Sequence, residues 1–174
     1  MNRKNTLFLA QAGIIGALYA ALTITQQLIF PGSASLSVQF RVAEVLTLLC
    51  VFMPSAIPGV TVGCLIANLT SSGALPIDTV LGATATLLAG LVMYKLRNVR
   101  VKGFPLLSAL MPAIFNGVII GWELEVFYID GPFNFTSFLI QCGLVALGEV
   151  TVCLVLGVPF VKVFEKRLMK IINR

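Results

Sequence analysis

The sequence predicts an all-α integral membrane protein, a bundle of six transmembrane helices with both termini in the cytoplasm. Of its 174 residues, 58% are hydrophobic and only 11% are charged, whereas soluble domains average roughly 25% charged residues. The apolar residues fall into six segments separated by polar or turn-forming stretches. Eleven of the twelve Lys and Arg residues lie in three short patches beside these segments. Basic residues next to membrane spans mark the cytoplasmic side, so the patches also predict the orientation.

The first apolar segment, roughly residues 7–30, follows the basic pair Arg3 and Lys4. It is longer than the roughly 7–15 apolar residues of a signal peptide, so we interpret it as a retained span. Small residues recur in it every four positions, and such stripes let another helix backbone come close. Internal packing and docking onto a separate membrane partner both explain the pattern. The two stripes are Ala12, Gly16, Ala20 and Gly13, Ala17, Ala21.

The next two predicted helices are short. They cover residues 40–53, ended by Pro54, and 58–69, which contains Gly59 and Gly63. Each is shorter than the roughly 20 residues that a full crossing needs. Short segments with Gly and Pro are tolerated at membrane depth where protein covers them or a cavity lies beside them. We therefore expect a tilted or shielded helix pair joined by a tight inner turn.

Three longer helices complete the single membrane domain predicted for residues 1–174. They cover residues 77–94, 104–122 and 135–160. A basic loop joins the first two of them, and an acidic, aromatic loop from Glu123 to Asn134 joins the last two. A basic amphipathic tail, residues 161–174, is expected at the inner membrane interface. With six spans, every basic patch falls on the cytoplasmic side and the acidic loop lies outside.

In this topology the polar side chains of the spans gather in the outer halves of the helices. Polar side chains in spans avoid lipid and face the bundle interior or a cavity. We therefore expect them to point at one outward-facing pocket. The candidate substrate-binding residues are Arg41, Glu44, Asn68, Asp78, Asn116, Trp122, Gln141 and Glu149.

Several of these candidates also have a structural explanation. Arg41 and Glu44 are three residues apart and can pair on one helix face. Asp78 lies in a first helical turn, where a carboxylate caps amide groups and suits the helix dipole. Asn68 and Asn116 can bridge helices. Trp122, together with Tyr128, can belong to an interfacial aromatic belt.

Glu149 is the candidate least easily explained by structure alone. A carboxylate near the middle of a span needs a partner, and Arg41 is the only basic residue within the spans. Either the two neutralise each other, or Glu149 binds a cationic or donor-rich ligand. Gln141, eight residues earlier, lies on the same broad helical face.

The sequence argues against several classes of function. It contains no histidine, so the usual histidine-based catalysis and metal ligation are absent. It has neither a phosphate-binding loop nor a GxSxG motif, and its four cysteines match no zinc or disulfide spacing. We expect no catalytic residue, metal or cofactor and no nucleic-acid partner. An intramembrane enzyme using a carboxylate pair such as Asp78 and Glu149 is the remaining catalytic alternative.

The net charge of +5 comes from loops and tail, where it suits the anionic headgroups of the lipid bilayer or cytoplasmic partners.

Three stretches of the chain resemble the QueT family of queuosine-precursor transporters. They are VQFRVAEVLT at residues 38–47, AIPG with GCLIANL between residues 56 and 69, and Asp78 followed by GATATL at 82–87. Their order is kept, and the resemblance covers most of the chain. It implies a substrate-binding S component of an energy-coupling factor (ECF) importer. Such a component has six helices and no ATPase, and it captures a vitamin-like solute from outside the cell.

The resemblance also implies partners and a ligand. The partners are a transmembrane coupling protein and two cytosolic ATPase subunits, reached through small residues on the first helix. The two stripes of that helix described above fit this role. The implied ligand is a 7-deazaguanine such as queuine or its aminomethyl precursor. An S component for another vitamin-like solute and a ligand-free membrane assembly protein are the alternatives.

The candidate residues suit a deazaguanine chemically. A carboxylate can accept the adjacent N–H groups of the guanine-like edge, and Glu44, Asp78 or Glu149 could serve. The ring carbonyl needs a donor, and the flat ring needs a stacking partner. The donor candidates are Arg41, Asn68, Asn116 and Gln141, and the stacking candidates are Phe40, Trp122 and Tyr128.

Overall fold

The computed structural model describes residues 2–31, 38–71 and 75–172, and over these ranges the regular elements are helices. The prediction of an all-helical chain is confirmed for them. The elements are α1 (Arg3–Ile29), the 3₁₀ helix η1 (Val42–Val51), α2 (Ala56–Leu69), α3 (Pro76–Lys95), α4 (Leu106–Ala109), α5 (Met111–Phe127), α6 (Phe135–Val152), the π-helical η2 (Cys153–Gly157) and α7 (Val158–Ile172).

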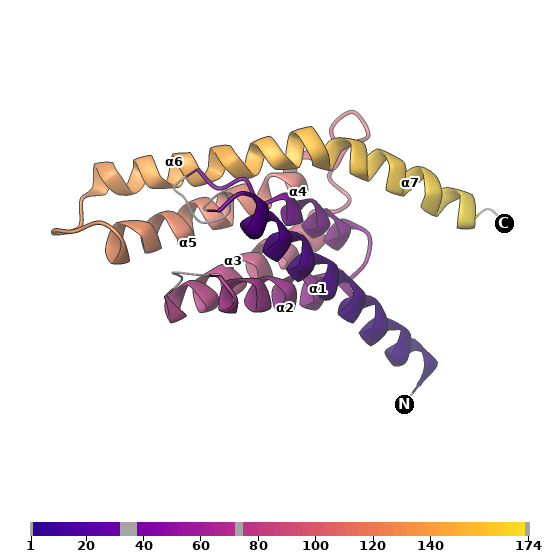
Figure 1. The fold of residues 1–174 in the computed structure, drawn as a ribbon. Helices are drawn as coiled ribbons and strands as arrows, with labels where there is room; N and C mark the ends of the chain where they lie inside the picture. The colour runs from indigo at the N-terminus through magenta and orange to yellow at the C-terminus, as the bar shows by residue number, and fades with distance from the viewer. Residues whose placement is uncertain (1, 32–37, 72–74, 173–174) are drawn as a thin grey trace.

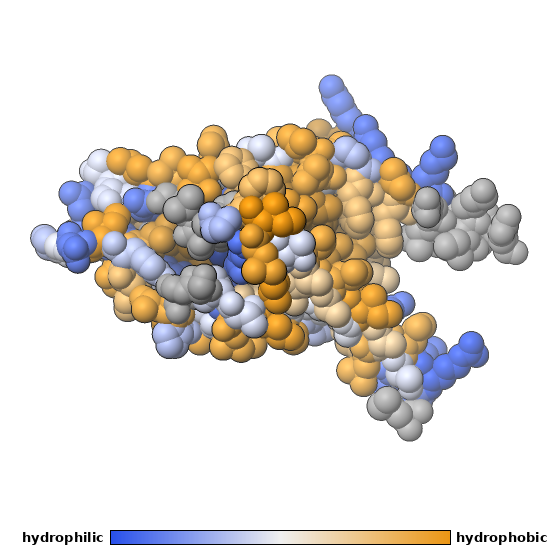
Figure 2. Space-filling view, viewed as in Figure 1, coloured by the Kyte–Doolittle hydropathy of each residue, from blue (hydrophilic) through white to orange (hydrophobic). Residues whose placement is uncertain are grey.

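Four helical stretches in the described ranges are long and apolar enough to cross a membrane: Arg3–Ile29, Pro76–Lys95, Leu106–Phe127 and Phe135–Lys166. Both termini lie at one end of the bundle, and the turn between α5 and α6 lies at the other (Figure 1). Apolar residues cover the middle of the visible face, and hydrophilic residues gather at both ends (Figure 2). This arrangement is that of a multi-pass membrane protein. The count of six spans and the cytoplasmic side remain predictions.

The 3₁₀ helix η1 occupies the centre of the bundle and packs against α1, α2, α3, α6 and η2. The sequence predicts a helix over 40–53 without its type. A 3₁₀ helix rises about 2.0 Å per residue, so its ten residues cover about 20 Å. Because it has three residues per turn, residues at intervals of three share one side. That side carries Arg41, Glu44, Thr47 and Cys50, all buried.

The small residues of α1 face two different surroundings. A Cβ on Gly63 of α2 would lie 2.6 Å from the Gly16 carbonyl oxygen and 2.7 Å from the Tyr19 Cβ. The stripe of Ala12, Gly16 and Ala20 therefore packs inside the bundle against α2. The stripe of Gly13, Ala17 and Ala21 is exposed, and a Cβ on Gly13 would meet nothing within 4 Å. Internal packing explains the first stripe but not the second.

Helix α5 is longer at its C-terminal end than the predicted segment 104–122. It continues to Phe127, so the prediction that the loop begins at Glu123 is wrong. Glu123 and Glu125 are 2% and 3% exposed on this helix. Acidic side chains are expected in solvent, but both of these are buried, and Glu125 Oε1 accepts a hydrogen bond from the Asn134 backbone amide at 2.9 Å. At its other end the segment begins as the single turn of α4 before α5 starts at Met111.

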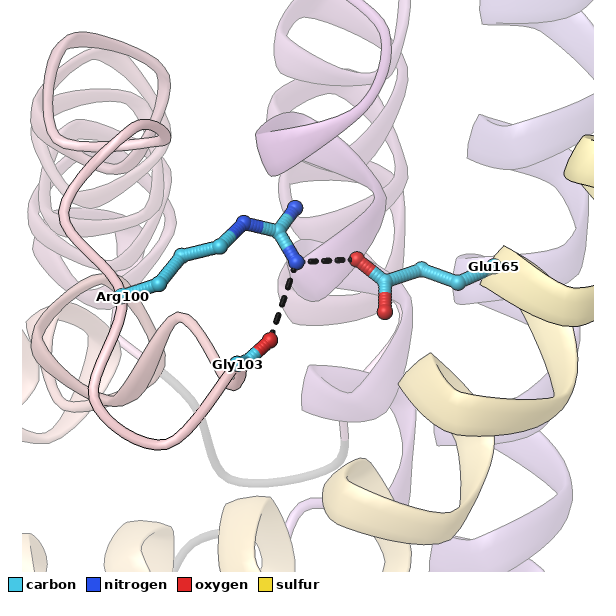
Figure 3. A network of polar contacts seen from close by, with 3 residues as sticks. All are labelled: Arg100, Gly103 and Glu165. Atoms are coloured by element: carbon cyan, nitrogen blue, oxygen red, sulfur yellow. Dashed lines mark hydrogen bonds and ion pairs between the residues drawn. The ribbon is translucent and has the colours of Figure 1, made fainter.

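The predicted tail is helical, and its first turns belong to the bundle. Val161 is fully buried, and Phe160 and Phe164 pack against the core. The rings of Phe164 and Phe52 lie 5.2 Å apart. Arg100 in the loop after α3 donates from Nη1 to the Gly103 carbonyl at 3.0 Å and to the Glu165 carboxylate at 2.5 Å (Figure 3). This contact ties the basic loop to α7.

Replacing Gly63 by alanine should destabilise the contact between α1 and α2, because the added methyl would overlap the α1 backbone. Overpacking of this kind costs about 1–3 kcal/mol. Thermal unfolding in detergent should therefore show a lower midpoint for Gly63→Ala than for the wild type. Gly13→Ala, on the open side of α1, is the matched control and should not lower the midpoint. Equal midpoints for the two variants would contradict the described crossing.

Candidate functional site

The site is built around Arg41, whose side chain is only 8% exposed. The chain approaches Arg41 through an extended stretch that crosses α6 at Gly148. A Cβ on Gly148 would collide with the backbone of Gln39, so glycine is required there for the close approach. The crossing brings Arg41 into electrostatic range of Glu149, the residue after Gly148, and of Glu44.

The deep part of the site holds two buried hydrogen-bonded pairs. The Tyr19 hydroxyl donates to Glu44 Oε1. The Asn116 side-chain amide donates to Glu149 Oε1 at 2.9 Å. All four side chains are 0–1% exposed. Each glutamate therefore has one oxygen held in place and a second oxygen left over.

The rim of the site is formed where α3 begins and α5 ends. Asp78 Oδ2 accepts a hydrogen bond from the Leu75 backbone amide at 2.8 Å and another from the Tyr128 hydroxyl. The capping role expected for Asp78 is thus present, but it occupies only this one oxygen. Glu123 lies within hydrogen-bonding reach of the Asp78 side chain and in the field of Arg41. Asn68 donates to the Asp78 backbone carbonyl at 3.1 Å, bridging α2 to α3.

Among the described residues, the buried side-chain atoms without a hydrogen-bond partner are all acceptor oxygens. They belong to Gln39, Glu44, Asp78, Asn116, Glu123, Glu125, Gln141 and Glu149. A buried polar atom left unpaired costs about 1–3 kcal/mol, and buried polar groups in native proteins are nearly always paired. An oxygen left unpaired in this way can accept a hydrogen bond from a molecule that carries N–H or O–H donors.

The charged groups of the cluster also favour a ligand that donates hydrogen bonds. Arg41 acts electrostatically on Glu44, Glu149 and Glu123, and Asp78 adjoins Glu123. Four carboxyl groups therefore share one guanidinium in this part of the described chain. A buried charge is stable only when it is paired and hydrogen-bonded. The cluster therefore suits a ligand that brings hydrogen-bond donors or positive charge.

Two of the predicted site residues lie apart from these contacts. Trp122 is 41% exposed and makes an edge-on contact with the Phe127 ring at 5.9 Å, which suits an interfacial aromatic better than a stacking partner. Gln141 lies on α6 with its Oε1 buried and unpaired in the described structure. It is eight residues before Glu149, and within the described ranges its side chain makes no hydrogen bond to the cluster.

An open apolar groove of about 390 Å³ lies outside the cluster, between the end of α1 and the stretch leading into η1. Gln26 of α1 connects the two segments, because its Oε1 accepts a hydrogen bond from the Val42 backbone amide at 2.9 Å. Phe40, a predicted stacking residue, lines the groove and is 42% exposed. The groove is lined by Leu22, Thr25, Gln26, Ile29, Phe30, Phe40 and Val42.

The sequence reasoning missed Tyr19 and Glu123 as site residues. Tyr19 stands among the small residues of α1, and a buried tyrosine hydroxyl usually finds a polar partner. Glu123 is seven residues after Asn116, which places both on one face of a continuous helix. Both signals were present in the sequence, but the second depends on α5 continuing past Trp122.

Tyr128, just beyond the end of α5, should ionise unusually late. Partial burial, together with the hydrogen bond and the charge of Asp78, raises its pKa to about 12 from an ordinary value of about 10. The protonated hydroxyl and its bond to Asp78 should therefore persist above pH 10 and be lost as pH rises through about 12. The difference in tyrosinate absorbance between the wild type and Tyr128→Phe measures this titration. A Tyr128 signal near the ordinary value would contradict the contact.

Comparison with known proteins gives two matches. Residues 9–166 match the family model described as QueT transporter. The chain is 30% identical over 158 residues to the queuosine precursor transporter QueT of Lactococcus lactis subsp. cremoris (strain MG1363), covering 86% of this chain and 87% of that protein. No solved structure matches the chain.

Proposed function

Because the chain belongs to the QueT transporter family, we propose that it captures a queuosine precursor in the polar cluster around Arg41. The ligand is a 7-deazaguanine such as queuine or its aminomethyl precursor, taken up from outside the cell. The chain acts as the S component of an ECF importer, with a transmembrane coupling protein and two ATPase subunits supplying the energy. Membership of a transporter family implies transport rather than catalysis.

The observation that carries this proposal is the set of buried, unpaired acceptor oxygens. A guanine-like edge offers adjacent N–H donors, and a carboxylate can accept two of them. Glu149 suits this role because Asn116 holds one of its oxygens at 2.9 Å and the other is unpaired among the described residues. Glu44, held in the same way by Tyr19, is the second carboxylate at this depth.

The same part of the cluster supplies donors for the ring carbonyl. Arg41 is buried beside Glu44 and Glu149, and a guanidinium carries five N–H donors. A ligand that places its N–H edge on a carboxylate and its carbonyl toward Arg41 matches this alternation of acceptor and donor. Sites built to hydrogen-bond a substrate group reject analogues that lack it, because the buried partners then stay unpaired.

The docking surface proposed for the coupling protein is the exposed stripe of Gly13, Ala17 and Ala21. Small residues on a helix surface let a second helix backbone approach closely. The other stripe is already occupied, since Gly16 packs against Gly59 and Gly63 of α2. Because only the Gly13, Ala17 and Ala21 stripe is exposed, its face of α1 is the one we propose for docking.

Replacing Glu149 by glutamine should weaken deazaguanine binding strongly while leaving the fold intact. Hydrogen bonds to charged groups contribute about 1.5–3 kcal/mol, which corresponds to a loss of affinity of about 10- to 150-fold. Titration of the purified chain in detergent with queuine and with 7-aminomethyl-7-deazaguanine measures this. Asp130→Asn, an exposed acid in the turn after α5, is the control and should bind like the wild type.

Unchanged affinity and unchanged yield for Glu149→Gln would overturn the role of Glu149. Tight binding of thiamine or riboflavin in place of any deazaguanine would favour an S component for another solute. A folded wild-type chain that binds none of these compounds would favour the ligand-free assembly protein.

A bulky residue on the exposed stripe should block assembly without affecting ligand capture. Gly13→Leu is expected to abolish co-purification with the coupling protein while deazaguanine affinity stays at the wild-type value. Gly143→Leu is the matched control. A Cβ added at Gly143 would also meet nothing within 4 Å, but this residue lies on α6. Equal co-purification of both variants would place the docking surface elsewhere.

A further inference from the structure

We propose that Asp78 and Glu123 form a subsite for the cationic amine of the ligand, so that they select an aminomethyl deazaguanine over neutral deazaguanines. This inference rests on the proposed function and assigns a role to two residues at the rim of the same cluster. The ligand class it names is a primary ammonium carried on a short arm of a bicyclic base.

The two carboxylates are arranged as a receptor for such a group. Asp78 is held in place through Oδ2, which accepts from the Leu75 amide at 2.8 Å and from the Tyr128 hydroxyl. Its Oδ1 is buried and has no partner in the described part of the chain. Glu123 is 2% exposed and lies beside Asp78, and its Oε1 is likewise unpaired. An ammonium has three donors and no acceptor, so it can pair with both free oxygens at once.

The charged groups around Asp78 and Glu123 favour a bound cation. Two adjacent carboxyl groups cannot both ionise without repelling each other, and a positive group between them would favour the ionised form of both. Arg41 is the basic side chain that acts on Glu123, but it also acts on Glu44 and Glu149 deeper in the site. Four carboxyl groups share this one guanidinium, so a second positive charge from the ligand's ammonium would favour their ionised forms.

The spacing along α5 fits one ligand held at both ends. Asn116, which binds Glu149 in the deep part of the site, lies seven residues before Glu123. Seven residues are nearly two helical turns, so both side chains lie on one face, about 10.5 Å apart along the axis. That separation suits a bicyclic base with a one-carbon amine arm and one hydrogen bond at each end. The base edge would then bind at Glu149 and the amine at Asp78 and Glu123.

The test compares two ligands that differ at the arm. The full chain in detergent is titrated with 7-aminomethyl-7-deazaguanine and with 7-cyano-7-deazaguanine, whose nitrile carries no charge and no donor. In Glu123→Gln the affinity ratio of the amine to the nitrile should fall about tenfold or more, the effect expected for one charge-assisted hydrogen bond. Asp130→Asn should keep the wild-type ratio.

Glu149→Gln should weaken both ligands together, because it acts on the base that they share. A wild-type ratio in Glu123→Gln, or an equal loss of both ligands, overturns the subsite while leaving the proposed function in place. If the wild-type chain binds neither compound, the subsite fails. If it also fails to bind queuine, the proposed function fails too. Should Glu123→Gln bind neither compound, Asp78→Asn is the second variant, and an unchanged ratio there also overturns the subsite.

Discussion

The burial of Arg41 among carboxylates is the constraint on which the rest of the structure depends. A charge at this depth is stable only when paired and hydrogen-bonded, and carboxyl groups from elements far apart in the sequence lie within electrostatic range of Arg41. The 3₁₀ helix brings Glu44 onto the same side as Arg41, and Gly148 lets the extended stretch before Arg41 cross α6 beside Glu149. Helix α5 then carries Glu123 into the same field.

The carboxyl groups around Arg41 keep unpaired oxygens that the proposed ligand would complete. Among the described residues its unpaired buried atoms are all acceptor oxygens, and its carboxylates outnumber its single guanidinium. A core selected only for stability would pair these atoms or replace them with apolar groups. The imbalance is understandable if a ligand with several N–H donors completes the pairing, and a queuosine precursor, the ligand named for the relative from Lactococcus lactis, has this chemistry.

The all-helical class and several residues of the buried cluster could be predicted because polar residues stand out in apolar segments. Arg41, Glu44 and Glu149 were predicted for this reason, and the structure brings them together. Glu123 was missed because two acids near a helix end are typical of a loop, and only the folded chain shows that both are buried. The 3₁₀ form of η1 depends on backbone hydrogen bonds that hydropathy does not encode. The two stripes of α1 look alike in sequence, and the glycines of α2 decide which one is packed.

A structure of the chain with bound 7-aminomethyl-7-deazaguanine tests the central claim most directly. The expected result is a base whose N–H edge contacts Glu149, with its ring carbonyl toward Arg41, so that oxygens unpaired in the free protein gain donors. A ligand bound instead in the apolar groove beside Gln26 and Phe40, with the cluster around Arg41 unchanged, would contradict it.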